Sequence, residues 1–392
     1  MQIKDRIGIK IDSVAFGGDG VGRVDNFVVF VPFAAPGDEL EIEIIQRKKK
    51  FARGKILRIV NPSDKRVDPL CVYYGNCGGC CYQHINYKTQ IAIKKNQVTD
   101  AFEKIGGIAA PPVRDVIPSP RFYHYRGKAK LHAGEVAAGK TLGFMDISGA
   151  QVVDIERCEI VDETINKKIA GLRADKHLLS GMTGECSIWS GASPVANENE
   201  LIIREVQEKT FFVPREGFFQ ANLYLTEKLV EEVCRLSAAT EIETLIDAYC
   251  GSGLFSVFLS PYAKNIFGIE YDQASVACAR MNAAENGAEN VNFYAGDVED
   301  ILSRNFSPRK NRPDVALLDP PRIGCSAPVL QALVRLLPRR IIYISCNPAT
   351  QARDVKYLNG QGYKLISLLP LDMFPQTQHI EVIGVLEAAR EK

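Results

Sequence analysis

From residue 220 to the C-terminus, short apolar runs alternate with segments of helical periodicity, and this alternation constrains the fold more than any other feature of the chain. It is typical of a parallel sheet in which helices connect successive strands and cover both faces. The sequence therefore predicts an α/β domain with a doubly wound sheet over residues 216–392. The predicted strands lie in the stretches TLIDAYC, NIFGIEY, VNFYAGD, DVALLDP and RIIYISC.

The first 62 residues read as short strands separated by glycine-containing turns, which favours a small closed β-barrel of the oligonucleotide-binding (OB-like) kind. A basic run, Arg47–Lys50, continues into Phe51 and Arg53, so that cations flank an aromatic side chain. Such a run is either a solvated hairpin or an RNA contact. Residues 63–215 predict a β-rich central domain, with one helix at about 84–108 that we expect to pack on the C-terminal domain.

Composition limits the classes of function. The net charge is +1, so any nucleic-acid surface must be a local patch rather than the field of a polycation. Charges lie among the apolar residues of the N-terminus, and no apolar run is long enough to span a bilayer. We therefore expect a cytoplasmic monomer that does not bind membranes.

A glycine-rich turn follows the first predicted strand of the C-terminal domain, where Gly251 and Gly253 let a ligand approach the backbone. Acidic residues lie in or at the end of four successive strands: Asp247, Glu270, Asp297 and Asp319. Each alone is readily explained as a helix N-cap, but four acids do not suit a polyphosphate ligand. They suit a nucleoside that carries a positive charge, and so predict S-adenosylmethionine.

Cys346 follows the last of these strands, directly before Asn347 and Pro348. Asn is a good N-cap and Pro fits the first turn of a helix. Cys346 should therefore lie beside a helix N-terminus, whose dipole favours thiolate over thiol. The position suits a reactive cysteine at the ligand-binding edge of the sheet, and equally a small buried hydrophobic residue.

Three closely spaced cysteines, Cys71, Cys77 and Cys80, indicate a metal or cluster site, since disulfides are rare in the cytoplasm. Zinc and an iron–sulfur cluster are both compatible with the spacing. A fourth ligand is needed. Cys81 is adjacent to Cys80 and poorly placed, whereas Cys158 is remote but follows a strand-like run.

Six motifs occur in order along almost the full chain: CVYYGNCGGC, FFQAN, DAYCGSG, DPPRIG, SCNPAT and FPQTQHIE. Together they resemble the RNA uridine-5-methyltransferase family, a class I, S-adenosylmethionine-dependent family. The closest resemblance is to its large-subunit (23S) ribosomal RNA branch, which has an N-terminal RNA-binding TRAM domain. It implies methylation of carbon 5 of a ribosomal RNA uridine in a single strand or loop, with the base flipped out. Transfer RNA methylation and a non-catalytic RNA-binding iron–sulfur protein are the alternatives.

The reaction explains which residues such an enzyme needs. Carbon 5 of uracil becomes nucleophilic once a thiolate adds to carbon 6, and a base must later remove the carbon 5 proton. The resemblance assigns the nucleophile to Cys346 and the base to Glu381, with His379 as the second candidate base and Cys325 as a disfavoured rival nucleophile. Pattern and resemblance together predict cofactor contacts at Gln220, Tyr249, Gly251, Gly253, Glu270, Asp297 and Asp319, with Gln220 contacting either cofactor or flipped base. The resemblance also selects a [4Fe–4S] cluster on Cys71, Cys77, Cys80 and Cys158.

Overall fold

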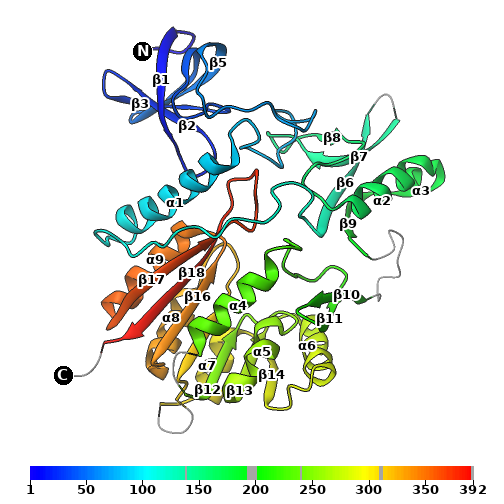
Figure 1. Cartoon of the computed structure of the whole chain (residues 1–392), viewed down its shortest axis with the longest axis vertical. Helices are drawn as coiled ribbons and strands as arrows, with labels where there is room; N and C mark the ends of the chain where they lie inside the picture. The colour runs from blue at the N-terminus through cyan, green and yellow to red at the C-terminus, as the bar shows by residue number, and fades with distance from the viewer. Residues whose placement is uncertain (137–138, 192–200, 239–240, 309–311, 390–392) are drawn as a thin grey trace.

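The computed structural model describes residues 1–136, 139–191, 201–238, 241–308 and 312–389. Residues 192–200, in the predicted central domain, and 390–392, at the end of the predicted C-terminal domain, lie outside this range. The described strands form a closed barrel, a four-stranded sheet, a two-stranded hairpin and a seven-stranded sheet. Figure 1 shows the barrel at one end of the molecule and the seven-stranded sheet at the other.

The N-terminal barrel is closed, as the short strands and glycine turns predict. Its strands are β1 (Arg6–Val14), β2 (Gly20–Val24), β3 (Phe27–Val31), β4 (Glu39–Arg47) and β5 (Phe51–Asn61). Alternate residues such as Val29, Val31 and Ile42 are fully buried inside the barrel, as the two-residue period of strands requires. The basic run lies in the β4–β5 hairpin, where residues 48–50 are exposed.

The central domain combines a sheet with two helices that the strand-like pattern did not predict. The sheet contains β6 (Lys128–Val136), β7 (Gly139–Met145), β8 (Val152–Asp154) and β9 (Gly184–Trp189), and the helices are α2 (Glu163–Ala174) and α3 (Lys176–Gly181). Ile165, Ile169 and Leu172 of α2 pack into the same core as the sheet. Their helical spacing was a signal that the sequence analysis missed.

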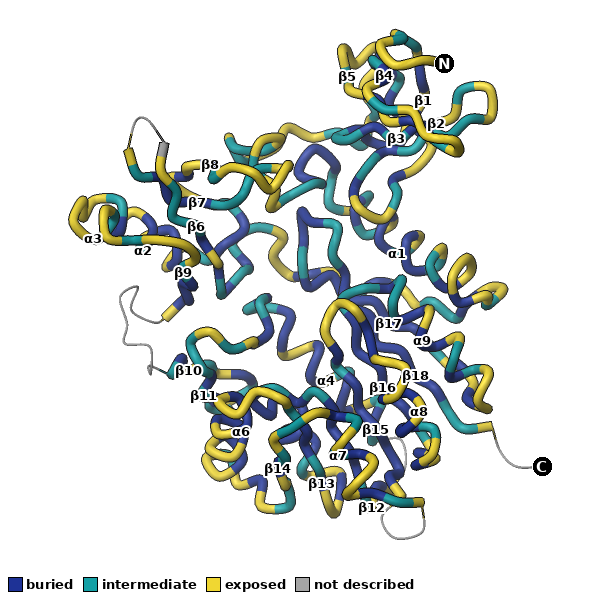
Figure 2. The backbone as a smooth tube through the Cα atoms, turned by 180° about the vertical axis from the view of Figure 1, so that it is seen from behind, coloured by how far each residue is buried: buried dark blue, intermediate teal, exposed yellow. Residues whose placement is uncertain are grey.

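The C-terminal domain has the doubly wound sheet that the alternation predicts. Its order is β14-β13-β12-β15-β16-β18-β17, and β18 alone runs antiparallel to its neighbours. The strands are β12 (Ile242–Ala248), β13 (Ala263–Glu270), β14 (Val291–Ala295), β15 (Val315–Leu318), β16 (Arg340–Ser345), β17 (Tyr363–Leu371) and β18 (Glu381–Ala388). Figure 2 shows β16, β17 and β18 buried along most of their length.

Helices cover both faces of this sheet. One face packs against α4 (Thr226–Ser237), α5 (Leu254–Leu259) and α6 (Gln273–Glu285), with the short 3-10 helix η1 (Ser260–Tyr262) after α5. The other face packs against α7 (Val298–Asn305), α8 (Ala327–Leu336), α9 (Pro348–Gly360) and the end of α1 (Tyr87–Lys104). No helix among the described residues has the length and apolar content to cross a membrane.

The hairpin of β10 (Leu201–Val206) and β11 (Lys209–Pro214) belongs to the C-terminal core. Asn282 of α6 accepts a hydrogen bond from the backbone N–H of Phe212 at 2.6 Å and donates one to its carbonyl at 2.9 Å. The predicted boundary between the central and C-terminal domains, at residue 215, therefore follows this hairpin, whereas the structure places the hairpin with the C-terminal domain. Strand periodicity alone could not reveal which core the hairpin joins.

Candidate active site

Cys346 and Glu381 lie together at one edge of the sheet because β16 and β18 are antiparallel neighbours. Ser345, the last residue of β16, pairs with Val382 near the start of β18. The carboxyl end of β16 therefore meets the amino end of β18, and the residues that follow and begin these strands share one edge. Glu381 is only 5% exposed, while Cys346 is half-buried.

Cys346 precedes α9 as expected, and Asn347 caps that helix by accepting a hydrogen bond from Ala349 at 3.1 Å. The ionisation of Cys346 differs from the thiolate that a helix N-terminus favours. Burial raises the pKa of the Cys346 thiol to about 12, and the carboxylates of Glu381 and Asp319 add to the rise. Burial and neighbouring negative charge thus outweigh the helix dipole, and the cysteine is a thiol at neutral pH.

Asp319, which is partly buried, and Glu381, which is buried, form a pair of interacting carboxyl groups. Burial raises the pKa of Asp319 to about 7, and the charges of Asp247 and Glu270 contribute. Burial and the charge of Asp319 also hold the pKa of Glu381 well above its ordinary value. Because two like charges in a buried site disfavour each other, the pair retains a proton at pH values where exposed carboxyl groups are ionised.

Arg322 is a member of this site that the sequence analysis did not assign. Its guanidinium is the positive side chain that opposes the rise of the Cys346 pKa. Its backbone carbonyl accepts hydrogen bonds from Asn347 at 3.1 Å and Thr350 at 3.2 Å, which fix it to the start of α9. The signal was available, since the residue stands in the motif DPPRIG shortly after Asp319.

His379, the second candidate base, contacts Arg322 through its ring nitrogens, at 2.7 Å for Nδ1. Burial, with Arg322, Lys94 and Arg126 nearby, lowers the pKa of His379 to about 4. The imidazole is therefore neutral at pH 7 and a weak proton acceptor. This favours a structural role for His379 and leaves Glu381 as the stronger candidate base.

Five of the predicted cofactor residues lie at the carboxyl ends of β12, β13 and β14: Tyr249, Gly251, Gly253, Glu270 and Asp297. Gly251 donates its N–H to Glu270 Oε2 at 3.0 Å, which joins the glycine turn to the end of β13. A Cβ atom on Gly253 would lie 3.1 Å from Ala279 and Phe293, and its φ of +81° also favours glycine. Asp297 is the N-cap of α7, because its carboxylate accepts a hydrogen bond from the backbone N–H of Glu299 at 2.8 Å.

Asp247 and Tyr249 lie beneath the glycine turn. Burial raises the pKa of Asp247 to about 7, and the Ser256 hydroxyl donates to it at 2.6 Å. Among the described residues its other carboxylate oxygen is buried without a hydrogen-bond partner. Tyr249 has a φ of +66° and packs with the core on the α7–α9 side of the sheet. The acidic edge thus contains both buried and capping carboxylates.

Gln220 is 8% exposed and lies between β11 and α4. Within the described part of the chain its side-chain amide has no recorded hydrogen bond, which leaves it able to bind a ligand. The nearby Asn222 donates to the backbone carbonyl of Met373 at 3.2 Å. This bond connects the FFQAN segment to the loop that leads to Glu381.

That loop, residues 372–380, is held by α1, which brings three parts of the chain together (Figure 1). Lys94 pairs with Asp372 at 2.5 Å and both side chains are fully buried. Gln90 donates to the Gln376 side chain at 2.9 Å, and Gln97 donates to the barrel carbonyl of Ala15 at 2.9 Å. The buried face of α1 is therefore partly polar.

We expect Lys94→Met to lower the free energy of unfolding by about 3–5 kcal/mol, because it leaves Asp372 buried without its cation. Lys104→Met is a matched control, since Lys104 of the same helix pairs with Asp100 at the surface. That change should cost no more than about 0.5 kcal/mol. Denaturant titration of both variants measures the difference. Equal losses of unfolding free energy would show that the buried pair stabilises the protein no more than the surface pair.

The four predicted ligand cysteines are half-buried and lie near one another. Burial raises the pKa of Cys158 to about 11, with Cys77 and Cys71 contributing. Burial also raises the pKa of Cys80, with Cys158 and Cys77 contributing. Cys81 faces the barrel instead, because a Cβ on Gly18 would lie 3.0 Å from its sulfur.

The cysteines do not have the arrangement of a single-ion site: the described residues contain no group of three His, Cys, Asp or Glu side chains that could hold one metal ion. Thiolates on one zinc ion lie about 2.3 Å from it and hence close together. A cluster of several iron atoms holds its cysteines further apart. Four thiols are a donor set that both zinc and iron–sulfur clusters use.

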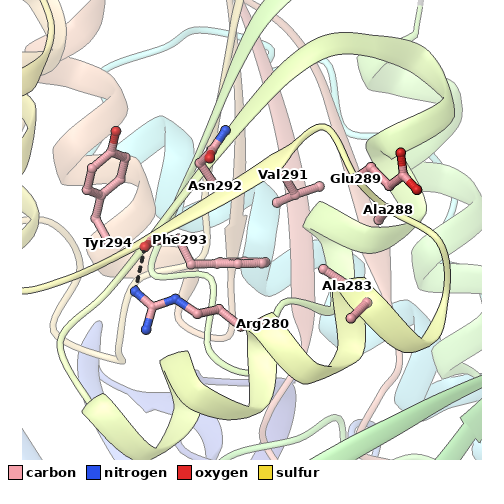
Figure 3. Close-up of a pocket in the computed structure, with 9 residues that line it drawn as sticks. Arg280, Ala283, Ala288, Glu289, Val291, Asn292, Phe293 and Tyr294 are labelled. Atoms are coloured by element: carbon pink, nitrogen blue, oxygen red, sulfur yellow. Dashed lines mark hydrogen bonds between the residues drawn. The ribbon is translucent and has the colours of Figure 1, made fainter.

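A pocket of about 570 Å³ lies elsewhere, between α6 and the edge strand β14. Figure 3 shows Arg280 reaching across it to donate a hydrogen bond to the Phe293 carbonyl, at 2.9 Å. Its walls come from the body of β14 rather than from the carboxyl ends of the strands. We therefore do not assign it to the site that contains Cys346 and Glu381.

Comparison with known proteins places the chain in a family. The sequence model described as tRNA (Uracil-5-)-methyltransferase matches residues 197–390, and the TRAM domain model matches residues 4–57. An uncharacterized RNA methyltransferase of Halalkalibacterium halodurans is 32% identical, covering 98% of this chain and 97% of its own. The chain belongs to the RNA (uracil-5-)-methyltransferase family. A relative from Gloeobacter violaceus, also named an uncharacterized RNA methyltransferase, is 34% identical over 97% of this chain and 96% of its own.

A solved structure supports the fold along the whole chain of this RNA (uracil-5-)-methyltransferase. It is the Pyrococcus abyssi tRNA (uracil-54, C5)-methyltransferase in complex with S-adenosyl-L-homocysteine, with a TM-score of 0.73 and 24% sequence identity. The match covers 97% of this chain and 100% of the other. The class I methyltransferase fold and the N-terminal TRAM barrel predicted from the sequence are thus confirmed.

Proposed function

We propose that this protein methylates carbon 5 of a uridine in large-subunit ribosomal RNA, with Cys346 as nucleophile and Glu381 as general base. The observation that carries the proposal is the meeting of these residues at one sheet edge, beside Asp319. Family membership supplies the reaction class. The geometry supports the residue roles, because a reaction that begins with a thiolate and ends with proton removal needs both groups at one base.

The proposed reaction begins and ends at the sulfur of Cys346. The Cys346 thiol loses its proton to solvent, and Arg322 stabilises the thiolate. The sulfur adds to carbon 6 of the flipped uracil, which forms an enolate and makes carbon 5 nucleophilic. Carbon 5 would take the methyl group from the sulfonium of S-adenosylmethionine, which would leave as the thioether S-adenosylhomocysteine, and Glu381 would then remove the carbon 5 proton. The electrons of that C–H bond restore the double bond and expel the Cys346 thiolate.

S-adenosylmethionine would supply the methyl group at the acidic edge of the sheet. Gly251 and Gly253 form the turn where a nucleoside would lie, and Glu270 is joined to that turn. The buried amide of Gln220 would bind the nucleoside or the flipped base. The other proposed contacts to the cofactor are Asp297, Tyr249 and Asp319. The donor chemistry fits, because carboxylates there favour a cationic ligand over a polyphosphate.

Transfer RNA is the second candidate substrate. The family model is named for tRNA, and the P. abyssi tRNA enzyme matches this chain along 97% of its length, including the barrel. The barrel therefore does not separate the two substrates. Incubation with S-adenosylmethionine labelled in the methyl group, separately with ribosomal and transfer RNA, followed by mapping of the labelled nucleotide, decides between them. Labelled 5-methyluridine in neither RNA would overturn the proposal.

We also propose that Cys71, Cys77, Cys80 and Cys158 hold a [4Fe–4S] cluster. Their mutual proximity and the all-thiol donor set support it. The cluster would be structural, because methyl transfer needs no change of oxidation state. Cys81 and Tyr82 follow the cysteine run and donate their backbone N–H groups to the Gln376 carbonyl at 3.0 Å each, which ties the proposed cluster to the loop before Glu381.

Protein purified without oxygen should be brown and contain about four irons per chain. Cys80→Ala should lower the iron content sharply, whereas Cys81→Ala, one position away, should retain it because Cys81 faces the barrel. Iron analysis and the absorption spectrum measure both. Stoichiometric zinc in colourless protein would contradict the assignment.

A further inference from the structure

A second pocket, of about 230 Å³, lies where four parts of the chain meet. The barrel contributes Phe33 and Arg53, the β7–β8 hairpin contributes Ile147, and the loop before β18 contributes Gln378 and His379. The fourth part is the cysteine run at residues 78–81, so the pocket borders the proposed cluster at Cys80. The pocket is smaller than the roughly 300–1,000 Å³ typical of sites for drug-sized ligands. Its size suits a single planar base rather than a helix or strand of a partner protein.

We propose that this pocket binds a nucleotide of the substrate RNA that flanks the target uridine, an inference that rests on the proposed function. The pocket is next to the active site, because His379 on its wall contacts Arg322 at 2.7 Å. Arg322 in turn stands beside Cys346. A strand that delivers its flipped base to Cys346 would thus bring a neighbouring nucleotide to this wall.

The lining supplies what recognition of a single-stranded nucleotide requires. Arg53 is an exposed cation suited to a phosphate, although it also pairs with Asp19 at 2.9 Å. The Phe33 ring is fixed edge-on against Tyr74, with 5.4 Å between ring centres. With Ile147, which is 55% exposed, it offers apolar surface for a base.

Gln378 is suited to read the edge of that base. Among the described residues its side-chain amide has no recorded hydrogen bond, so two donors and an acceptor remain for a ligand. A Cβ on the barrel residue Gly17 would lie 3.7 Å from Gln378 Oε1, so the amide sits where the barrel meets the loop before Glu381. Barrel and catalytic loop would then hold one nucleotide jointly.

Arg53→Ala and Arg58→Ala form a matched pair, because both arginines are exposed on β5 and each pairs with a carboxylate, Arg58 with Glu41 at 3.4 Å. Only Arg53 lines the pocket. Arg53→Ala should raise KM for RNA about tenfold at unchanged kcat, the worth of one charge-assisted contact. It should also reduce the salt dependence of binding by about one phosphate contact, while Arg58→Ala should change neither.

Photo-crosslinking locates the bound nucleotide in whichever RNA the protein selects from a mixture. A benzophenone amino acid replaces Ile147, or Ile366 on the edge strand β17 as the control, and total ribosomal and transfer RNA are the probes. We expect position 147 to crosslink within about two nucleotides of the uridine that receives labelled methyl. No crosslink above the Ile366 control, or one remote from the methylated uridine, would overturn the pocket assignment. Crosslinking at position 147 without methylation of any RNA would support the pocket and overturn the proposed function.

Discussion

Glu381→Gln is expected to accumulate a methylated protein–RNA adduct that survives denaturation. The proposed base acts after the new carbon–carbon bond has formed, so its loss should spare attack by Cys346 and methyl transfer but block elimination. Free 5-methyluridine should fall by about two to four orders of magnitude, the usual worth of a positioned general base. Denaturing electrophoresis with methyl-labelled cofactor and unmodified RNA measures both quantities.

His379→Gln is the control for this variant, because His379 borders the same site and its lowered pKa makes it a weak base. We expect it to turn over without accumulating adduct. Normal turnover by Glu381→Gln would assign the base to another group. Inactivity without adduct would show that Glu381 is needed before methyl transfer, as in orienting the uracil.

Cys346→Ala should abolish methyl transfer, lowering the rate by at least about four orders of magnitude, because no thiolate remains to activate carbon 5. Cys325→Ala should retain activity. Cys325 is 4% exposed and lies within the core under α8, where it has no access to a flipped base. An active Cys346→Ala together with an inactive Cys325→Ala would identify Cys325 as the nucleophile.

The raised pKa of Cys346 adds a pH dependence to this prediction. Only the thiolate reacts with iodoacetamide, and with a pKa of about 12 its fraction grows with pH throughout the neutral range. Alkylation of Cys346 in the absence of RNA should therefore be slow at pH 7 and accelerate about tenfold per pH unit up to about pH 10. A rate that levels off below about pH 8 would mean that the helix dipole dominates after all.

The sequence predicted the doubly wound sheet because short apolar runs alternate with segments of helical periodicity. It did not predict β17 or the place of β18 between β16 and β17, because the pairing of strands is set by packing rather than by local pattern. That insertion is what brings Glu381 beside Cys346, so the resemblance had to supply the pair.

The sequence also did not predict which contacts hold the loop before Glu381 in place. Gln90, Lys94 and Gln97 read as the solvent face of a helix, since such residues are seldom buried. They are buried because each has a partner from a distant part of the chain, such as Asp372 for Lys94. Partners of this kind leave no periodic trace in the sequence. The raised pKa of Cys346 was likewise not predicted, because it comes first from burial and then from Glu381 and Asp319, which lie on other strand ends.

The central claim is that Cys346 forms a covalent bond to carbon 6 of the target uridine. The most direct test uses the RNA that accepts labelled methyl, with 5-fluorouridine at the target position, because fluorine cannot leave as a cation and the adduct cannot resolve. Incubation with S-adenosylmethionine followed by mass spectrometry of the digested complex locates the bond. We expect a methylated fluorouridine on the peptide that contains Cys346, and none with Cys346→Ala. An adduct on Cys325, or full trapping by Cys346→Ala, would contradict it.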